Sequence, residues 1–276
     1  MPETIKGGQP TSTAVANKLM MLWFGMPGSG KTSAMLTYPP PLHYVNLDRD
    51  PSELFKQLPP NHEITYEGIP YDVDTNPASA TQILAKVDSM ARKAAVGKKG
   101  SFLLDGLDLL WEYVKVAKLP KTSGKDTNLA REYADANSWM HGFLGRLHAA
   151  HIHVGFTSVA REIWRAQSQG TGTYEPQGFA KRDRWMTHEV YLFSPEDTAP
   201  QEKPRDATQT GQSHRGYIKV SKYNEAEMVR RVVPNITFKI LYKLSFGSLP
   251  KKHEDLWTPT ASSLPTTDSP PKSTEG

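Results

Sequence analysis

Short apolar runs, separated by polar segments rich in glycine and proline, dominate the pattern of this chain. The runs at residues 19–24, 42–47, 101–104 and 152–157 have the length and composition of buried strands. Later runs at 189–193, 216–222 and 236–244 predict further strands, and the middle one alternates strictly between polar and apolar residues. Most of the predicted strands are therefore short and interior.

Helical spacing of apolar residues separates these runs. It predicts helices over 31–37, 78–95, 107–116 and 129–149. The prolines of 51–77 predict an irregular segment, 118–128 reads as an exposed loop, and 165–180 has the composition of a flexible loop. Strands alternating with helices predict an α/β fold around a mainly parallel sheet, followed by late antiparallel strands.

Domain organisation follows from composition. The chain has 276 residues, enough for one sizeable domain, which we place at 18–250. Residues 1–17 predict a flexible segment, and 251–276, rich in Pro, Ser and Thr, predict a disordered tail.

The absence of cysteine excludes disulfides, Cys-ligated zinc and thiol nucleophiles. No segment resembles a signal peptide or a membrane span, so we expect a soluble cytoplasmic protein with no membrane partner.

The net charge of +4 is mild, but it is unevenly distributed. Residues 201–250 hold nine Lys and Arg against four Asp and Glu, whereas residues 1–200 hold 21 of each sign. The positive excess therefore lies in the late strands, and it points to a local surface for an anionic partner.

The most specific motif spans residues 25–32, with the sequence GMPGSGKT. It matches the phosphate-loop pattern G-x-x-x-x-G-K-[ST], lying between a predicted strand and a predicted helix. Its backbone N–H groups predict an ATP site, with Lys31 on the β and γ phosphates and Thr32 on Mg²⁺. The nucleotide-binding set is Gly25, Pro27, Gly28, Ser29, Gly30, Lys31, Thr32 and Ser33.

Asp105 ends the apolar run FLLD, and a phosphate loop requires such a carboxylate to hold its metal. The alternative is an ordinary helix cap. Asp48, Asp50 and Asp108 are candidates for activating water, and Asp48 or Asp50 could equally be a turn residue before Pro51.

Two weaker signals accompany these residues. Thr157 and Ser158, at a strand end, could sense the γ phosphate. The histidines at 148, 151 and 153 lack a carboxylate at ligand spacing, so we expect them at a helix end and on the surface rather than on zinc.

With these pieces placed, residues 18–245 resemble phage and prophage nucleotide-binding proteins of the AAA-ATPase type with a RecA-like core. Some of these act in ATP-dependent single-strand annealing or recombination. The resemblance is carried by GMPGSGKT, YVNLD followed by Asp50, FLLDGLDLL, HVGFTS, GYIKVSKYN and PNITFKILYKL.

This resemblance implies a RecA-like P-loop ATPase, in the host cytoplasm if phage-encoded. Asp50 would stand where such proteins carry a catalytic glutamate, giving Lys31, Asp50 and Asp105 as the catalytic set. Lys222 would reach ATP across the subunit interface of a homo-oligomer. A solvated lysine on an edge strand is the alternative for Lys222.

The resemblance also implies a DNA-binding loop at residues 161–185, where basic and aromatic residues alternate as in single-strand binding sites. Loop 118–128 is a second basic candidate. We predict contacts with single-stranded DNA from Arg161, Arg165, Lys181, Arg182, Arg184, Arg230 and Arg231.

Three functions are compatible with the sequence. The first is an ATPase acting on single-stranded DNA in recombination or annealing. The second is a P-loop motor or switch acting on a protein assembly, for DNA packaging or replication. The third, a small-molecule kinase, would use the segment around 161–184 as a lid.

Overall fold

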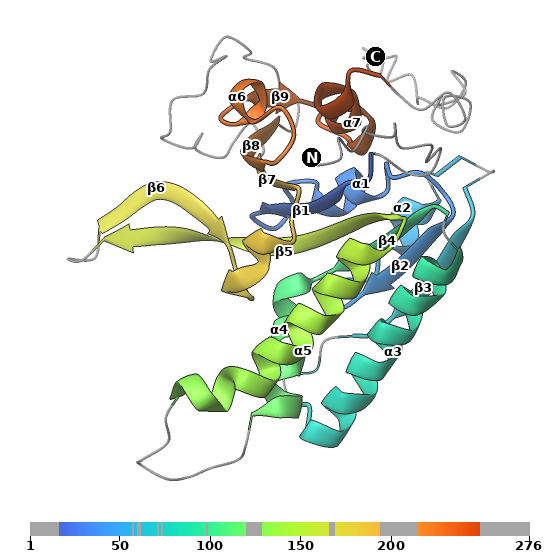
Figure 1. Ribbon diagram of the computed structural model, residues 1–276, viewed down its shortest axis with the longest axis vertical. Helices are drawn as coiled ribbons and strands as arrows, with labels where there is room; N and C mark the ends of the chain where they lie inside the picture. The colour runs from blue at the N-terminus through green and yellow to red at the C-terminus, as the bar shows by residue number, and fades with distance from the viewer. Residues whose placement is uncertain are drawn as a thin grey trace, which may run out of the picture.

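A mixed sheet of nine strands forms the centre of the molecule (Figure 1). The computed structural model describes residues 17–248, except 57, 60–61, 71, 73, 98, 120–128, 166–168 and 194–214. Eight strands run in the order β3 (Ile64–Gly68), β2 (Leu42–Asn46), β4 (Ser101–Asp105), β5 (His153–Arg165), β1 (Met20–Gly25), β7 (His188–Phe193), β8 (Arg215–Ser221), β9 (Val232–Pro234). Neighbours from β3 to β7 are parallel, and β8 and β9 are antiparallel. The predicted α/β architecture is confirmed at this level.

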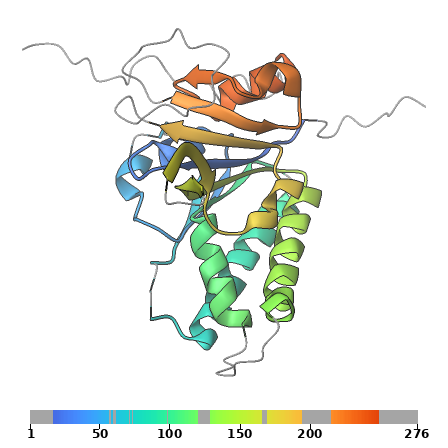
Figure 2. The same ribbon diagram turned by 90° about the vertical axis from the view of Figure 1, so that its left-hand side faces the viewer.

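Two helical layers bury both faces of the sheet (Figures 1 and 2). One layer holds α3 (Pro77–Gly97), α4 (Leu107–Lys118) and α5 (Leu129–Ala149); the other holds α1 (Lys31–Met35) and α7 (Phe238–Phe246). Along β1, Met20 and Leu22 enter the first core, while Met21 and Trp23 enter the second. This burial on both sides explains why β1 is apolar throughout.

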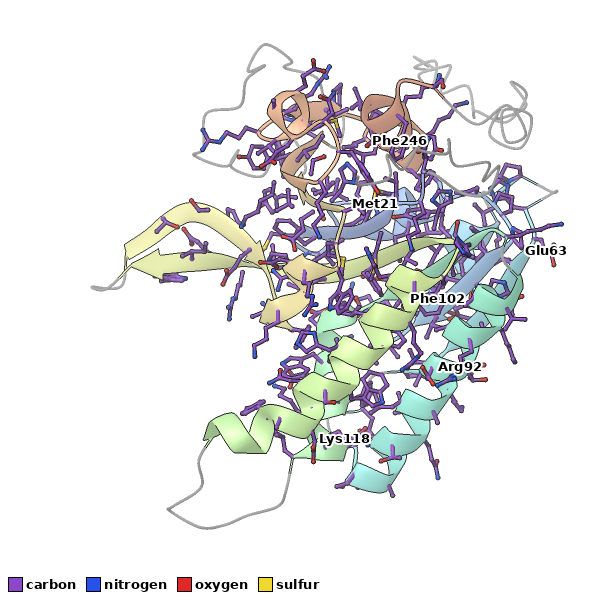
Figure 3. The ribbon with its side chains drawn as sticks, in the orientation of Figure 1. Met21, Glu63, Arg92, Phe102, Lys118 and Phe246 are labelled. Atoms are coloured by element: carbon purple, nitrogen blue, oxygen red, sulfur yellow. The ribbon has the colours of Figure 1, made fainter. Side chains whose placement is uncertain are left out.

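The labelled side chains in Figure 3 mark the two layers. Arg92 and Lys118 lie with the α3–α5 layer, and Phe246 lies with α7 on the other side of the sheet. The parallel strands between these layers all end at one edge, so residues following β1, β4 and the parallel part of β5 meet there. In open α/β sheets ligands bind outside such carboxyl ends.

The segment predicted as a flexible loop at 165–180 contains a strand, β6 (Gln169–Pro176), which pairs antiparallel with β5. Thr171 donates from Oγ1 to the Ile163 carbonyl at 2.6 Å. Gly172 has φ of 65° and donates its N–H to Glu162 Oε1 at 2.8 Å. The prediction was wrong because the glycines allow the antiparallel pairing: Gly172 takes a left-handed φ, and a side chain at Gly170 would collide with the Glu162 carboxylate.

The predicted strand at 236–244 is also wrong, because these residues begin the helix α7. The Thr237 hydroxyl accepts from Ile240 N at 3.3 Å and caps its start. Phe238, Leu241 and Tyr242, spaced three and four residues apart, are the buried face of the helix.

Five short elements were not predicted. They are α2 (Ser52–Phe55) and β3 within the segment taken as irregular, the 3-10 helix η1 (Ala180–Arg184), α6 (Glu225–Met228) and the strand β9. β3 is an edge strand whose side chains are mostly exposed, so it lacks an apolar run.

Some predictions fall outside the described residues: the segment 1–16, the tail 251–276 and the loop positions 120–128. Among the helices that the structure describes, none has the length and apolarity to cross a membrane.

Candidate functional site

The loop at residues 25–32 leaves β1 at Gly25 and enters α1 at Lys31. Gly28 and Gly30 adopt left-handed conformations, with φ of 82° and 86°, that favour glycine. A side chain at Gly25 would collide with the Leu192 carbonyl and with Ser29 Oγ. Ser29 Oγ is buried and has no hydrogen-bond partner among the described residues. The loop is thus a tight turn in which the buried Ser29 hydroxyl makes no hydrogen bond to the described residues.

Lys31 bends back over this loop. Its Nζ donates to the carbonyl oxygens of Gly25 and Met26 at 3.0 and 2.9 Å. Burial lowers the pKa of Lys31, and the carboxylates of Asp105, Asp108 and Asp48 act in the opposite direction. The ammonium therefore stands at the loop, within electrostatic reach of three carboxylates.

Asp105, at the end of β4, is brought to Thr32 although 73 positions separate them in sequence. Thr32 Oγ1 donates to Asp105 Oδ2 at 2.8 Å, and Tyr44 donates to the same oxygen at 2.6 Å. Thr157 Oγ1 donates to Asp105 Oδ1 and accepts from Gly106 N at 2.9 Å. Hydroxyl groups from three elements thus hold a buried carboxylate beside the loop.

Thr157 was predicted as a γ-phosphate sensor, and the structure places it beside Asp105. Tyr44 was not predicted. It lies in the apolar run of β2 and is buried, and burial followed by the Asp105 charge raises its pKa well above the ordinary value. In the sequence, nothing separates Tyr44 from a core tyrosine.

Asp50 has turn contacts rather than contacts with the loop. Its Oδ1 accepts from the backbone N–H of Ser52 at 3.0 Å and from Tyr66 at 3.4 Å, and the side chain is exposed. Hydrogen bonds from Ser52 lower its pKa. Asp48 is also exposed, but its charge acts on Lys31. These contacts support the turn alternative for Asp50; its catalytic role stays a prediction.

The β5–β6 hairpin carries two of the predicted DNA contacts, Arg161 and Arg165, and projects from the body of the molecule (Figure 1). Arg161 pairs with Glu175 through Nε and the terminal nitrogen, at 2.8 and 2.6 Å. Trp164 exposes 62% of its surface. The backbone of Arg165 lies in β5, but its side chain is outside the described part of the structure.

Of the three basic residues in η1, Lys181 and Arg184 are exposed, whereas Arg182 is buried. Arg182 forms an ion pair with Glu189 at 3.2 Å and donates to the Phe179 carbonyl at 2.9 Å. The nucleic-acid prediction for Arg182 therefore needs correction, because its guanidinium points into the protein interior.

The basic residues Lys222, Arg230 and Arg231, late in the chain, differ in their exposure and contacts. Lys222 Nζ donates to the Arg184 carbonyl at 2.8 Å and joins the end of β8 to η1. Arg230 is exposed, with φ of 68°, and donates its N–H to Ile218 at 2.9 Å. Arg231 is half-buried. The hydrogen bonds of Lys222 and Arg230 given above thus lead to η1 and to β8 rather than to the phosphate loop.

The three histidines do not converge, and no group of metal ligands occurs among the residues that the structure describes. His151 is exposed as expected. His153 Nδ1 accepts from Leu19 N at 3.1 Å, and His148 packs on the Trp185 ring at 5.7 Å. His148 thus lies in the last turn of α5 as predicted, but its ring and that of His153 pack against neighbouring residues rather than facing the surface.

Comparison with known proteins adds no family. No protein-family model matches the chain, and a search of the curated proteins finds no significant match. Inference about function therefore rests on the geometry of the site.

Proposed function

We propose that this chain is a P-loop ATPase with a RecA-like core that binds Mg²⁺ and ATP between residues 25–32 and Asp105. The observation that carries the proposal is the 2.8 Å hydrogen bond from Thr32 to Asp105. In phosphate-loop ATPases the loop Ser or Thr and a strand-end Asp hold the metal together.

The residues present fit this cofactor. Oxygen donors, which Mg²⁺ prefers, come from Thr32 and Asp105, and bound Mg²⁺ would neutralise charge developing on the phosphates. Within the described part of the chain the Ser29 hydroxyl has no hydrogen-bond partner, and a side chain at Gly25 would have no room. Lys31 would exchange its bonds to the loop carbonyls for phosphate oxygens.

The Tyr44→Phe variant tests whether the hydrogen bond from Tyr44 orients the Asp105 carboxylate for Mg²⁺. We expect Tyr44→Phe to raise the Mg²⁺ concentration needed for half-maximal ATP binding by about 10-fold, as for other groups that orient metal-binding side chains. The ring stays in the core while Asp105 loses one donor. Titration of a fluorescent ATP analogue with Mg²⁺ measures the shift.

Tyr38→Phe is the matched control. Tyr38 is buried in the same core, but its hydroxyl accepts from Trp23 Nε1 at 3.1 Å, away from Asp105. Its Mg²⁺ requirement should equal that of the wild type. Equal Mg²⁺ requirements in the two variants would show that Tyr44 does not orient the metal ligand.

We further propose single-stranded DNA as the partner. The hairpin offers the exposed indole of Trp164, with the exposed Lys181 and Arg184 in η1. Aromatic stacking with nearby cations is the chemistry that binds single strands without sequence preference. The positive excess of residues 201–250 adds an electrostatic component.

Trp164→Ala should weaken binding to a single-stranded oligonucleotide by about 5- to 150-fold, the equivalent of one lost stacking contact. Val96→Ala, which truncates another exposed apolar side chain on α3, should leave affinity unchanged. Fluorescence anisotropy at two salt concentrations measures both, and wild-type affinity should fall as salt rises.

ATP hydrolysis with and without the oligonucleotide completes the test. Stimulation supports a DNA-dependent ATPase. No binding at low salt, together with nucleotide-dependent oligomers that ignore DNA, would instead favour an ATPase acting on a protein assembly.

A further inference from the structure

Asp108 is a buried carboxylate that has no part in holding phosphate or metal in the nucleotide site proposed above. It lies in the first turn of α4, just after Gly106, whose φ of 103° turns the chain from β4 into the helix. Only 9% of its surface is exposed. Its Oδ2 accepts from the backbone N–H of Val159 at 3.3 Å.

This contact fixes Asp108 relative to the phosphate loop. Val159 on β5 is the register partner of Gly25 on β1, the first residue of the loop. A carboxylate held at Val159 N therefore lies at the carboxyl edge of the sheet, beside the loop. Electrostatics agree, because the Asp108 charge acts on Lys31, whose Nζ is bonded to Gly25 and Met26.

The environment of Asp108 also suits proton transfer. Burial raises its pKa, and the nearby charge of Asp48 acts in the same direction, although backbone N–H groups lower it. A carboxylate whose pKa is raised toward neutrality is a better general base at physiological pH.

The other carboxylates are engaged or exposed. Asp105 accepts from Thr32 and Tyr44, where the metal would be held. Asp50 is exposed and accepts from Ser52. Asp48 is exposed, and its backbone N–H is bonded to Asn46 Oδ1 at 3.0 Å. Asp108 combines burial and proximity to the loop, and among the described residues its carboxylate accepts from backbone N–H groups and from no side chain.

The return of the hairpin packs on Asp108. A Cβ atom added to Gly178 would lie 2.7 Å from Asp108 Cα, so Gly178 permits close contact. The preceding Gln177 donates to the Val159 carbonyl at 2.9 Å, and its own carbonyl accepts from Ser158 Oγ at 3.1 Å. The end of β6 is thereby fixed beside Asp108, which limits the solvent around this carboxylate.

We infer that Asp108, rather than Asp50, is the general base of the ATPase proposed above, an assignment that rests on that function. The water oxygen forms a bond to the γ phosphorus, and the bond from this phosphorus to the β,γ-bridging oxygen breaks. ADP leaves with the electron pair of that bond. The proton lost by water passes to the Asp108 carboxylate and then to solvent.

The test compares Asp108→Asn with Asp50→Asn, using Asp74→Asn, at an exposed position before α3, as the control. We expect Asp108→Asn to lower kcat by about 10²- to 10⁴-fold, the usual contribution of a general base, and to keep its affinity for ATP. Asp50→Asn and Asp74→Asn should retain turnover. Single-turnover phosphate release and ATP titration measure the two quantities.

Chemical rescue separates a base from a structural residue. In Asp108→Ala, added formate should restore part of the lost turnover, whereas formamide, which has the same size but is not basic, should not. Asp108→Ser keeps a hydroxyl acceptor for the helix start and serves if the alanine variant does not fold. Turnover retained in Asp108→Asn, or lost in Asp50→Asn alone, would overturn the assignment.

Failure of the proposed function has a different outcome. A wild type that binds no ATP would overturn the ATPase proposal itself, and a wild type that binds ATP without hydrolysing it would overturn the general base while leaving the nucleotide site standing.

Discussion

We expect Lys31→Ala to lose ATP turnover while keeping its fold. The Lys31 ammonium is placed at the loop, and it would neutralise charge on the β and γ phosphates during transfer. Removing one such donor from a preorganised site lowers kcat by about 10²- to 10³-fold. Phosphate release at saturating ATP measures the loss, and ATP titration should show weakened binding too.

The fold should survive because the bonds of Lys31 go to two carbonyls of its own loop. The free energy of unfolding should change by about 0.5 kcal/mol or less. Lys56→Ala is the control, since Lys56 forms an exposed ion pair with Glu53 at 2.7 Å. Wild-type turnover in Lys31→Ala would mean that the phosphate loop is not the active site.

Lys31 and Asp108 should fail in different ways, which makes the pair informative. Lys31 would contact phosphate in both the ground state and the transition state, so its loss affects binding and turnover. Asp108 would act only when water is deprotonated, so its loss affects turnover alone. Weaker ATP binding in the Lys31 variant, together with unchanged ATP binding in the Asp108 variant, would therefore distinguish the phosphate-binding lysine from the general base.

The parallel core could be predicted because burial on both faces leaves a clear signal. β1, β4 and β7 are buried along their whole length, and each strand contains an apolar run. The order of the strands in the sheet could not be predicted from the sequence in this way. The placement of β5 between β4 and β1 depends on register and crossovers, which depend on contacts between distant residues.

The elements that were mispredicted had ambiguous local patterns. Residues 236–244 contain Phe238, Leu241 and Tyr242, which read as part of an apolar strand run and equally as one helix face; packing against the second core decides for the helix. In β6 the glycines suggest a loop when read alone. Their role emerges only against β5, where Glu162 occupies the space beside Gly170 and bonds to Gly172.

Some residues of the candidate site could likewise be predicted from the sequence, and others could not. Lys31, Thr32 and Asp105 are predictable because the phosphate loop has a local spacing and a strand-end carboxylate follows from its chemistry. Tyr44 could not be predicted, since its hydroxyl meets Asp105 only through the pairing of β2 with β4, where Asn46 and Asp105 are register partners. Arg182 was predicted to be an exposed DNA contact but is buried. Its sequence neighbours Lys181 and Arg184 are exposed, and nothing in the local sequence distinguishes the buried arginine from them.

Arg182→Ala should therefore destabilise the fold rather than act on DNA directly. Arg182 and Glu189 are buried together, and burial raises the pKa of Glu189 while the Arg182 charge lowers it. Removing the guanidinium leaves an uncompensated carboxylate, at a cost of about 3–5 kcal/mol of unfolding free energy. Urea denaturation at pH 7.5 measures this loss, and Lys181→Ala, at an exposed neighbour, should change stability by about 0.5 kcal/mol or less.

The pH dependence identifies the cause of the destabilisation. In Arg182→Ala the folded-state pKa of Glu189 rises further above its unfolded value of about 4.3. Folded protein then binds a proton more tightly than unfolded protein, so the deficit is largest at pH 7.5 and shrinks as the pH falls through the folded pKa. Replacing both partners with apolar residues, in Arg182→Met with Glu189→Leu, should restore most of the stability and keep DNA affinity. A stable Arg182→Ala protein with weakened DNA binding would return Arg182 to the nucleic-acid surface.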